Sequence, residues 1–388
     1  MYIALLGRQP ELSIAELERV FQKVSWVSPQ TALIETENTI DIQQFGGSQK
    51  IGRVSLTLET TDWRRISDSI VKHYSKHWAA ATGKITLGLS AYDLTTSPRE
   101  VQKVGLLLKS KLKNGDVSLR LVPNQEVALS SATAHHNKLG LSDNKIELLI
   151  IKGDRQTIIA ESIGAQNITA LAARDQGRPR RDAFVGMLPP KLAQIMINLA
   201  VGPSTGTKQR ILDPFCGTGV LLQEAALMGN AVYGTDLSEK MIRYTRDNLN
   251  WLQDSYRLTV DWYLHEGDAM DTQWQDPITA VVAETYLGQP FSAPPSPAKL
   301  TEVRGNCNHI IGGFLKNLSS QIKPGTPVVL AVPAWRNKEG DLTHLPLTTK
   351  VEDYGFSRMS LETVDSSRLL YSRPDQVVGR ELLLLIKK

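Results

Sequence analysis

A glycine-containing loop between a strand and a helix constrains the fold of this chain more than any other feature. The segment ILDPFCGTGVLLQEAALMG, residues 211–229, predicts a buried strand ending at Asp213, a loop with Gly217 and Gly219, and a helix. Gly229 is expected to end that helix as its C′ glycine. Glycines at such a turn let a ligand approach the backbone and the helix N-terminus. The segment therefore predicts a ligand-binding turn.

From Met187 onward, predicted strands and helices alternate along the chain. The expected strands are RILDPF, AVYGTD, WYLHEGDAM, ITAVVAE and TPVVLAVPAW, and the expected helices are VLLQEAALM, SEKMIRYTRDNLNWLQ and KLTEVRGNCNHIIGGFLKNLSSQI. GFSRMSLETV and RELLLLIKK are expected to add two last strands. Alternation at this spacing predicts a doubly wound α/β sheet for the C-terminal half.

The residues before about 165 show a different pattern, in which short strands are interleaved with a few helices. A strand is expected at Tyr2–Leu6, and helical periodicity follows from Ile14, with Ser13 as the expected N-cap. Another helix is expected at Pro98–Leu112. This mixture predicts two small α+β modules. The charged segment ITALAARDQGRPRRDAF, with its glycine and proline, is interpreted as a linker.

The length agrees with this division, since 388 residues correspond to two or three domains. We predict an N-terminal α+β domain at residues 1–80, a second α+β domain at 81–165, a basic linker at 166–183 and a C-terminal α/β domain at 184–388.

Composition excludes several classes of protein. The two cysteines, Cys216 and Cys307, are too few for a disulfide framework or a cysteine-only metal site, which favours a cytoplasmic setting. Apolar runs such as Leu382–Ile386 are too short to cross a bilayer, and the N-terminus does not resemble a signal peptide. The net charge of +4 is compatible with an anionic partner without identifying one. We expect a monomer with neither a metal ion nor a membrane partner.

Acidic residues follow three of the predicted strands, at Asp213, Asp236 and Asp268. Asp213 would repel the pyrophosphate of a dinucleotide, and Leu222 stands where the third glycine of the dinucleotide motif belongs. The sulfonium and ammonium groups of S-adenosylmethionine are instead attracted to an acid. We therefore predict S-adenosylmethionine as cofactor, with a purely structural turn as the alternative. The predicted cofactor-binding residues are Asp213, Phe215, Gly217, Gly219, Asp236, Leu237, Asp268 and Ala269.

DPFCGTG, GTD and GDAMD together resemble the class I methyltransferases that modify RNA. Residues 178–200 resemble the segment that leads into the catalytic domain of the THUMP-containing tRNA guanosine-N2 methyltransferases. LLYSRPDQVVGRELLLL and the N-terminal segments YIALLGRQPELSIAELE and FGGSQKIGRV are also similar to that family. The resemblance implies a Rossmann-like methyltransferase domain at 184–388, a THUMP-like RNA-binding domain at 81–165, and N2-methylation of a guanosine in tRNA.

The fourth predicted strand departs from the family pattern. Methyltransferases that act on exocyclic amines usually carry an Asp or Asn, two prolines and an aromatic residue there. In this chain Glu284-Thr285-Tyr286-Leu287-Gly288 follows ITAVVA. Alignment on the glycine places Glu284 at the acid position and Leu287 at the aromatic one. Alignment on Tyr286 keeps the aromatic residue and puts Ala283 where the acid belongs.

We hypothesise that Glu284 accepts the exocyclic N–H and that Tyr286, or nearby Phe291, stacks on the base. Two alternatives stay open: a decayed site in a non-catalytic RNA-binding protein, and a methyltransferase for another class of substrate.

The linker supplies the predicted RNA contacts. Arginine at such density suits phosphate groups, while a solvated charged face is the alternative. The predicted RNA-binding residues are Arg174, Arg178, Arg180 and Arg181.

Overall fold

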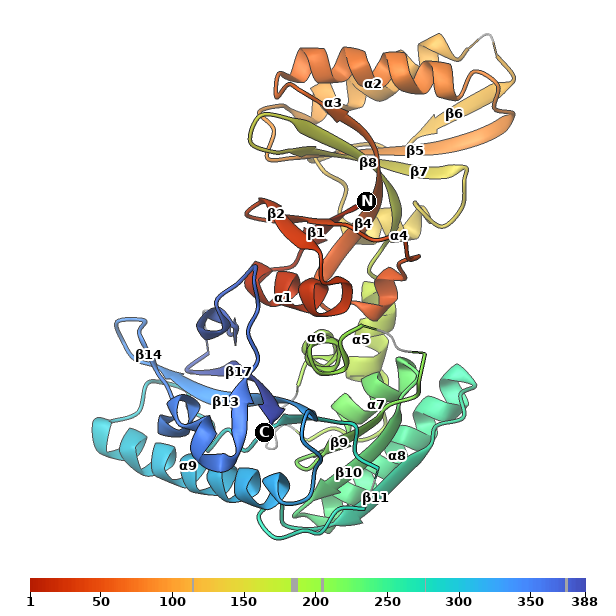
Figure 1. Cartoon of the computed structure of the whole chain (residues 1–388). Helices are drawn as coiled ribbons and strands as arrows, with labels where there is room; N and C mark the ends of the chain where they lie inside the picture. The colour runs from red at the N-terminus through yellow and green to blue at the C-terminus, as the bar shows by residue number, and fades with distance from the viewer. Residues whose placement is uncertain (114, 183–187, 204–205, 276, 374–375) are drawn as a thin grey trace. The chain divides into compact units, whose positions relative to one another are not determined.

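The computed structural model describes residues 1–113, 115–182, 188–203, 206–275, 277–373 and 376–388. The predicted boundary between linker and C-terminal domain, at 183/184, lies outside these residues. The chain forms two compact units (Figure 1). The first contains Met1–Pro10 and Lys23–Ala170, and the second contains Glu11–Gln22 and Leu171–Lys388.

The first unit is built on one eight-stranded sheet with the order β2-β3-β1-β4-β8-β7-β5-β6. Its strands are β1 (Tyr2–Leu6), β2 (Val24–Ser28), β3 (Thr31–Ile34), β4 (Ser48–Leu58), β5 (Gly83–Tyr92), β6 (Val117–Leu121), β7 (Lys145–Lys152) and β8 (Thr157–Ala165). The antiparallel pairing of β4 with β8 joins strands from residues 1–80 to strands from 81–165. These two ranges therefore share a sheet, and their division into two domains stays a prediction.

Two amphipathic helices cover part of this sheet, α2 (Trp63–His77) and α3 (Pro98–Lys111). Both begin at a capping side chain, since Asp62 accepts a hydrogen bond from the Arg65 N–H and Ser97 accepts one from the Glu100 N–H. Their apolar faces form one core with β5 and β7. The unit also contains α4 (Ser131–His136) and the 3₁₀ turn η1 (Ile42–Gln44).

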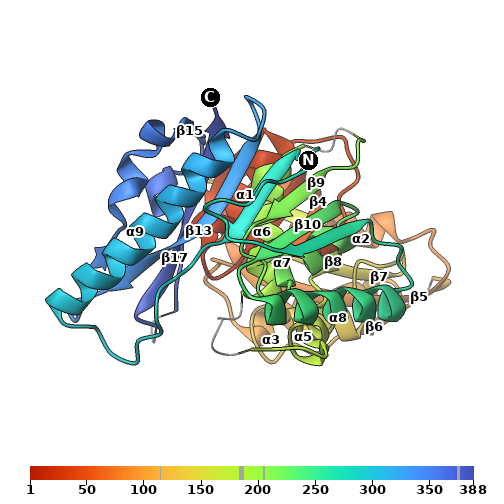
Figure 2. The ribbon, with the colours of Figure 1, turned by 90° about the horizontal axis from the view of Figure 1, so that it is seen from below.

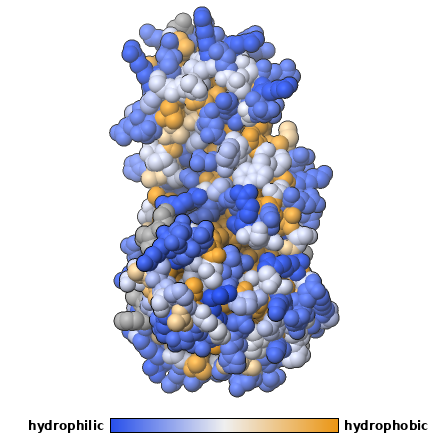
Figure 3. Space-filling model, turned by 90° about the vertical axis from the view of Figure 1, so that its left-hand side faces the viewer, coloured by the Kyte–Doolittle hydropathy of each residue, from blue (hydrophilic) through white to orange (hydrophobic). Residues whose placement is uncertain are grey.

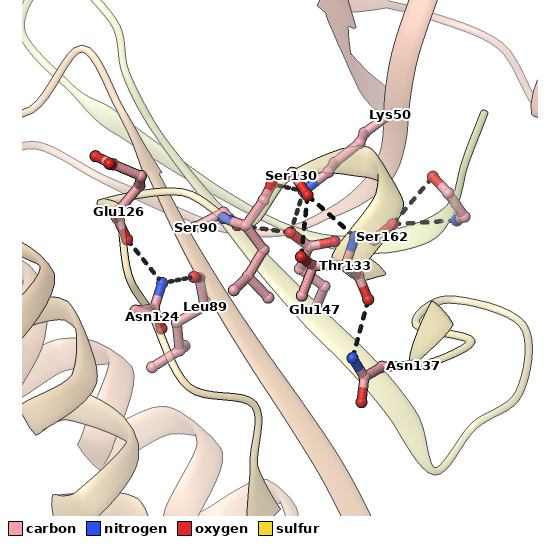
Figure 4. A network of polar contacts seen from close by, with 12 residues as sticks. Lys50, Leu89, Ser90, Asn124, Glu126, Ser130, Thr133, Asn137, Glu147 and Ser162 are labelled. Carbon is pink, nitrogen blue, oxygen red and sulfur yellow. Dashed lines mark hydrogen bonds and ion pairs between the residues drawn. The ribbon is translucent and has the colours of Figure 1, made fainter. Parts of the chain in front are cut away.

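A buried ion pair lies inside this unit (Figure 4). The ammonium group of Lys50 on β4 donates to the Glu147 carboxylate on β7 and to the Leu129 carbonyl oxygen. The Ser90 hydroxyl on β5 also donates to that carboxylate, at 2.6 Å, and accepts from the Leu129 N–H. Because both charges are almost entirely excluded from water, each depends on the other for compensation.

The second unit contains a doubly wound sheet with the order β11-β10-β9-β12-β13-β17-β15. The strands are β9 (Arg210–Asp213), β10 (Ala231–Asp236), β11 (Trp262–Glu266), β12 (Ala280–Glu284), β13 (Pro327–Arg336), β14 (Leu342–Thr343), β15 (Phe356–Arg358), β16 (Leu370–Tyr371) and β17 (Val378–Lys387). β9 to β13 are mutually parallel, and β17 pairs antiparallel with β13.

Helices lie on both faces of this sheet. Alternate residues of β12, β13 and β17 form one core with α9 (Pro297–Ser319), which runs alongside these strands in Figure 2. α6 (Pro190–Val201) packs on the same three strands, α7 (Val220–Leu227) on β9 and β10, and α8 (Glu239–Tyr256) on β10 and β11. The 3₁₀ turns are η2 (Pro346–Thr349), η3 (Val351–Tyr354) and η4 (Ser366–Arg368). The predicted α/β class is confirmed.

The N-terminal helix α1 (Pro10–Phe21) corrects one prediction. It begins at Pro10 and not at Ile14, so Ser13 is a buried residue inside the helix and not its N-cap. Proline is favoured in the first helical turn because the amide it lacks has no partner there. α1 groups with the second unit through hydrogen bonds from Asn198 to Glu16 and from Arg19 to the Leu199 carbonyl oxygen.

The segment predicted as a linker contains a helix, α5 (Ile168–Gly177). Among the described residues, no helix is both long and apolar enough to span a membrane. The face drawn in Figure 3 is mostly hydrophilic with smaller apolar areas between, as is usual for surfaces in contact with water.

Candidate functional site

A cavity of about 670 Å³ lies in the second unit, where β9, β10 and β12 end. Ligands of open α/β sheets bind at this edge, beyond the carboxyl ends of the strands. The lining includes seven of the eight predicted cofactor-binding residues and both predicted catalytic residues: Asp213, Phe215, Gly217, Asp236, Leu237, Asp268, Ala269, Glu284 and Tyr286.

The turn after β9 is held closed by carboxylates. Asp236 Oδ2 accepts from the Gly217 N–H at 2.9 Å, and its Oδ1 accepts from the Ser238 N–H at 2.9 Å. Asp213 Oδ1 accepts from the Phe215 N–H at 3.1 Å. The two acids therefore shape the loop as well as line the cavity.

Gly219, the eighth predicted residue, contributes to the loop without lining the cavity. It caps α7 with a φ of 79°, a conformation that favours glycine. A Cβ at this position would lie 2.7 Å from the Thr245 Cγ2 on α8.

Helix α8 holds the loop by hydrogen bonds to its backbone. These contacts were not predicted from the sequence. The Thr245 hydroxyl donates to the Gly217 carbonyl oxygen at 2.7 Å, and Asn248 Nδ2 donates to the Thr218 carbonyl oxygen at 2.8 Å. The available signal was two polar residues in the helix that packs on the loop after β9, but their partners lie 28 and 30 positions away.

Burial and mutual repulsion disfavour negative charge at the loop. Burial raises the pKa of Asp213 well above its ordinary value, the Phe215 N–H opposes this shift, and the charges of Asp236 and Glu284 add to it. Burial also raises the pKa of Asp236, against the two N–H groups that it accepts. A positively charged ligand would relieve this repulsion, which matches the predicted sulfonium cofactor.

Residues that follow β11 also line the cavity. Asp268 Oδ1 accepts from the Met270 N–H at 2.9 Å, and Asn317 of α9 donates to the Ala269 carbonyl oxygen at 3.2 Å. Leu237 is 71% exposed, and Phe215 packs edge-on against Phe314 with ring centroids 5.2 Å apart. The cavity therefore combines carboxylates with apolar surface, as expected for a nucleoside-containing ligand.

Glu284 is the last residue of β12, and its side chain forms an ion pair. Its Oε1 accepts from Arg380 Nε of β17, and the two side chains are only 13% and 9% exposed. The next residue, Thr285, is fixed to β13 because its N–H and its hydroxyl both donate to the Ala331 carbonyl oxygen. Tyr286 follows at 44% exposure, and Phe291 also lines the cavity. An acid and two aromatic residues therefore share one site.

The four predicted RNA-binding arginines have different environments. Arg174 forms a buried ion pair with Glu224, with Nε 2.6 Å from Oε1. Arg178 is buried, and its Nε and Nη2 have no hydrogen-bond partner among the residues that the structure describes. Arg180 is exposed and pairs with Asp247 at 2.7 Å, and Arg181 is exposed as well. Only the last two present their side chains to solvent.

Cys216 lies in the loop as a buried residue, and burial raises the pKa of its thiol well above the usual value. A thiol of this kind is a packing group and not a nucleophile. Within the described ranges, no three His, Cys, Asp or Glu side chains gather as a metal site would require.

The doubly wound sheet, with acids at or just after the ends of β9, β10 and β11 and a glycine turn before α7, is typical of Rossmann-like folds, including that of class I methyltransferases. Residues 178–300 match the family described as RMKL-like, methyltransferase domain. Residues 178–300 of the second unit are therefore similar to a methyltransferase domain, as the sequence predicted.

The matched relatives indicate which kind of methyltransferase this chain is similar to. A tRNA (guanine(10)-N2)-dimethyltransferase of Methanothermobacter thermautotrophicus is 33% identical over 167 residues, 42% of this chain and 45% of the relative. One from Pyrococcus abyssi is 43% identical over 106 residues, 27% of this chain and 26% of the relative. The matched region thus spans less than half of these relatives. The predicted resemblance to tRNA guanine-N2 methyltransferases is confirmed.

Among solved structures, TrmN from Thermus thermophilus has a TM-score of 0.53 at 15% identity, covering 100% of this chain and 99% of that one. At this identity the likeness concerns the fold.

Proposed function

We propose that this protein is an S-adenosylmethionine-dependent methyltransferase that methylates the N2 amine of a guanosine in tRNA. The observation that carries the proposal is one cavity that combines a cation-favouring loop, at Asp213 and Asp236, with an acceptor and an aromatic ring, at Glu284 and Tyr286. The names of the relatives supply the substrate.

The residues fit the cofactor. Asp236 at the end of β10 has the position from which an acid binds ribose hydroxyls, and Asp213 would face the cationic groups. Asp268 would accept from the adenine amino group. When bound, S-adenosylmethionine supplies an activated methyl group on its sulfonium.

The chain's own residues then align the amine and receive its proton. The amine nitrogen would bond to the methyl carbon, and bound S-adenosylmethionine would supply that methyl group and keep the carbon–sulfur electron pair on its sulfur. Glu284 accepts a hydrogen bond from the amine and takes the proton that the nitrogen loses. Tyr286 or Phe291 stacks on the base. This work is alignment and proton acceptance, without a covalent intermediate.

The test is turnover on unmodified tRNA transcripts with isotopically labelled cofactor, followed by mass spectrometry of the nucleosides. We expect N2-methylguanosine as product. Glu284→Gln keeps the shape of the side chain and is expected to reduce kcat by about 10²-fold, the scale of general-base catalysis. Tyr286→Phe retains the ring and serves as the control for Tyr286→Ala. Cofactor binding with no methylated nucleoside would favour the non-catalytic alternative.

For the partner, we propose that Arg180 and Arg181 contact phosphate groups, because their side chains are exposed. Replacing both with alanine should reduce the slope of log affinity for tRNA against log salt concentration by about 1–2. An unchanged slope would remove these arginines from the interface.

A further inference from the structure

Arg380 occupies an unusual position in the cavity. Of the described residues that form the lining, it is the sole lysine or arginine, whereas Asp213, Asp236, Asp268 and Glu284 are acids. A free guanidinium at this place would repel a cationic cofactor. We therefore look for the role of Arg380 in its contact with the Glu284 carboxylate.

The contact is built by the sheet. Glu284 is the last residue of β12 and lies opposite Ala331 of β13, while Arg380 of β17 lies opposite Pro333, two residues further along β13. The guanidinium therefore reaches across β13, and its Nε donates to Oε1 of Glu284. Both partners belong to strands of one continuous sheet, so the pair rests on a rigid frame.

The next residue of β17 faces away from Arg380, as strand alternation requires. Glu381 Oε2 lies 2.6 Å from His344 Nδ1, in a separate contact. Glu284 therefore meets a single cation at this edge of the described sheet.

A glutamate in this position needs such support. Its side chain has three rotatable bonds, and fixing them costs about 1–2 kcal/mol of conformational entropy. The backbone that follows includes Gly288 with a φ of 81°, and the first proline after Glu284 is Pro290. The loop therefore lacks the rigidity that adjacent prolines would give to the acceptor.

We propose that Arg380 is a positioning residue: it holds Oε1 of Glu284, so that Oε2 faces the cavity as the acceptor for the substrate amine. This role rests on the proposed function and adds a residue to it. Arg380 itself touches neither the reacting nitrogen nor the methyl group. The ion pair fixes the acceptor through side chains, in place of a rigid backbone.

The test compares Arg380→Met, Arg380→Lys, Glu284→Gln and the Arg380→Met/Glu284→Gln double variant in the full chain. Steady-state kinetics with unmodified tRNA give kcat and KM, calorimetry gives the affinity for S-adenosylmethionine, and thermal unfolding reports folding. Arg336→Met is the matched control, because Arg336 ends β13 nearby without lining the cavity.

We expect Arg380→Met to lower kcat by about 30-fold or more, with cofactor affinity changed by less than about 3-fold; loss of a charged hydrogen bond is of this size. Arg380→Lys should recover part of kcat because it retains the charge. The double variant should be no slower than Glu284→Gln, since the two residues act as a unit.

Other results would overturn the inference. Independent, multiplicative losses in the double variant, a loss confined to cofactor affinity, or equal losses in the Arg336→Met control would remove the positioning role. A rise in kcat with Arg380→Met would identify the pair as inhibitory. A wild-type chain that binds cofactor but methylates no tRNA refutes the proposed function and this role together, whereas an active wild type with an equally active Arg380→Met variant refutes this role alone.

Discussion

Replacement of Gly219 by alanine tests whether the glycine loop between β9 and α7 depends on the close contact between its backbone and helix α8. Gly219 has a φ of 79°, and a Cβ there would lie 2.7 Å from Thr245 Cγ2 and 3.0 Å from its Oγ1. Thr245 cannot turn away without breaking the hydrogen bond that its hydroxyl donates to the Gly217 carbonyl oxygen at 2.7 Å. The variant therefore suffers both backbone strain and overpacking.

The magnitudes follow from these two costs. A left-handed conformation costs a non-glycine residue about 1–2 kcal/mol, and overpacking a tight core adds about 1–3 kcal/mol. We expect Gly219→Ala to lose about 2–5 kcal/mol. In a domain of this size each kcal/mol lowers Tm by about 2–4 °C. Thermal and urea unfolding of the full chain measure the loss, and calorimetry with S-adenosylhomocysteine measures the binding that the distorted loop weakens.

Gly229 offers the matched control. Its φ is 87°, but a Cβ there would meet nothing within 4 Å. Gly229→Ala therefore carries the backbone strain alone, and the difference between the two variants isolates the contact with Thr245. Adding Thr245→Ser to Gly219→Ala removes the Cγ2 methyl group and keeps the hydroxyl, so it should restore part of the stability. Equal stability of the Gly219 and Gly229 variants would refute the reasoning.

Three further predictions concern buried charges. Asp213→Asn keeps the acceptor for the Phe215 N–H but removes the charge, so cofactor affinity should fall by about 10-fold or more in calorimetry. Burial raises the folded-state pKa of Asp213 above 3.8, so its contribution to stability is complete below that pH and is lost as pH rises through the folded pKa. Without ligand, the unfolding midpoint of Asp213→Asn should therefore exceed that of the wild type near neutral pH. The two midpoints should converge in acid. Lys50→Met strands the Glu147 carboxylate and should destabilise the first unit by about 3–5 kcal/mol in urea unfolding, with Lys50→Met/Glu147→Gln recovering part of the loss; an unchanged midpoint would contradict a dependence of either charge on its partner. Arg174→Met should lower stability in the same way through Glu224 while leaving the salt dependence of tRNA binding unchanged, and a smaller salt slope would return Arg174 to the RNA interface.

The glycine loop after β9 was predictable because its signals are local. A strand that ends at Asp213, glycines that open a helix and Gly229 at its close all lie within one short segment, and the structure reproduces them. Parallel strands bring their carboxyl ends to one edge, so Asp236 and Asp268 follow from the alternation alone.

Helix α2 was not among the predicted elements, although its sequence carries local signals of a helix. Asp62 is an N-cap, and Ile66, Ile70 and Tyr74 repeat at intervals of four residues to form its buried face. The many charged residues between them conceal this stripe, because they make the segment polar on average.

The features that were not predicted depend on pairing between distant segments. β4 and β8 join across about a hundred residues, so one sheet forms where short local patterns suggested two modules. Helix α1 packs with a unit whose remaining residues begin at Leu171. Local periodicity specifies that an element exists and which face is apolar, but it does not specify the distant element that covers that face.

The same limit explains why the sequence around Glu284 leaves open whether the site is active. Without its distant partner, Glu284 would add a fourth carboxylate to the cavity, which is already lined by Asp213, Asp236 and Asp268. Arg380 lies 96 residues away and neutralises that addition. The formal charges of Glu284 and Arg380 cancel within the pair. The negative charge available to attract a cationic cofactor is then that of the remaining three carboxylates, so the change in sequence is compatible with the proposed cofactor.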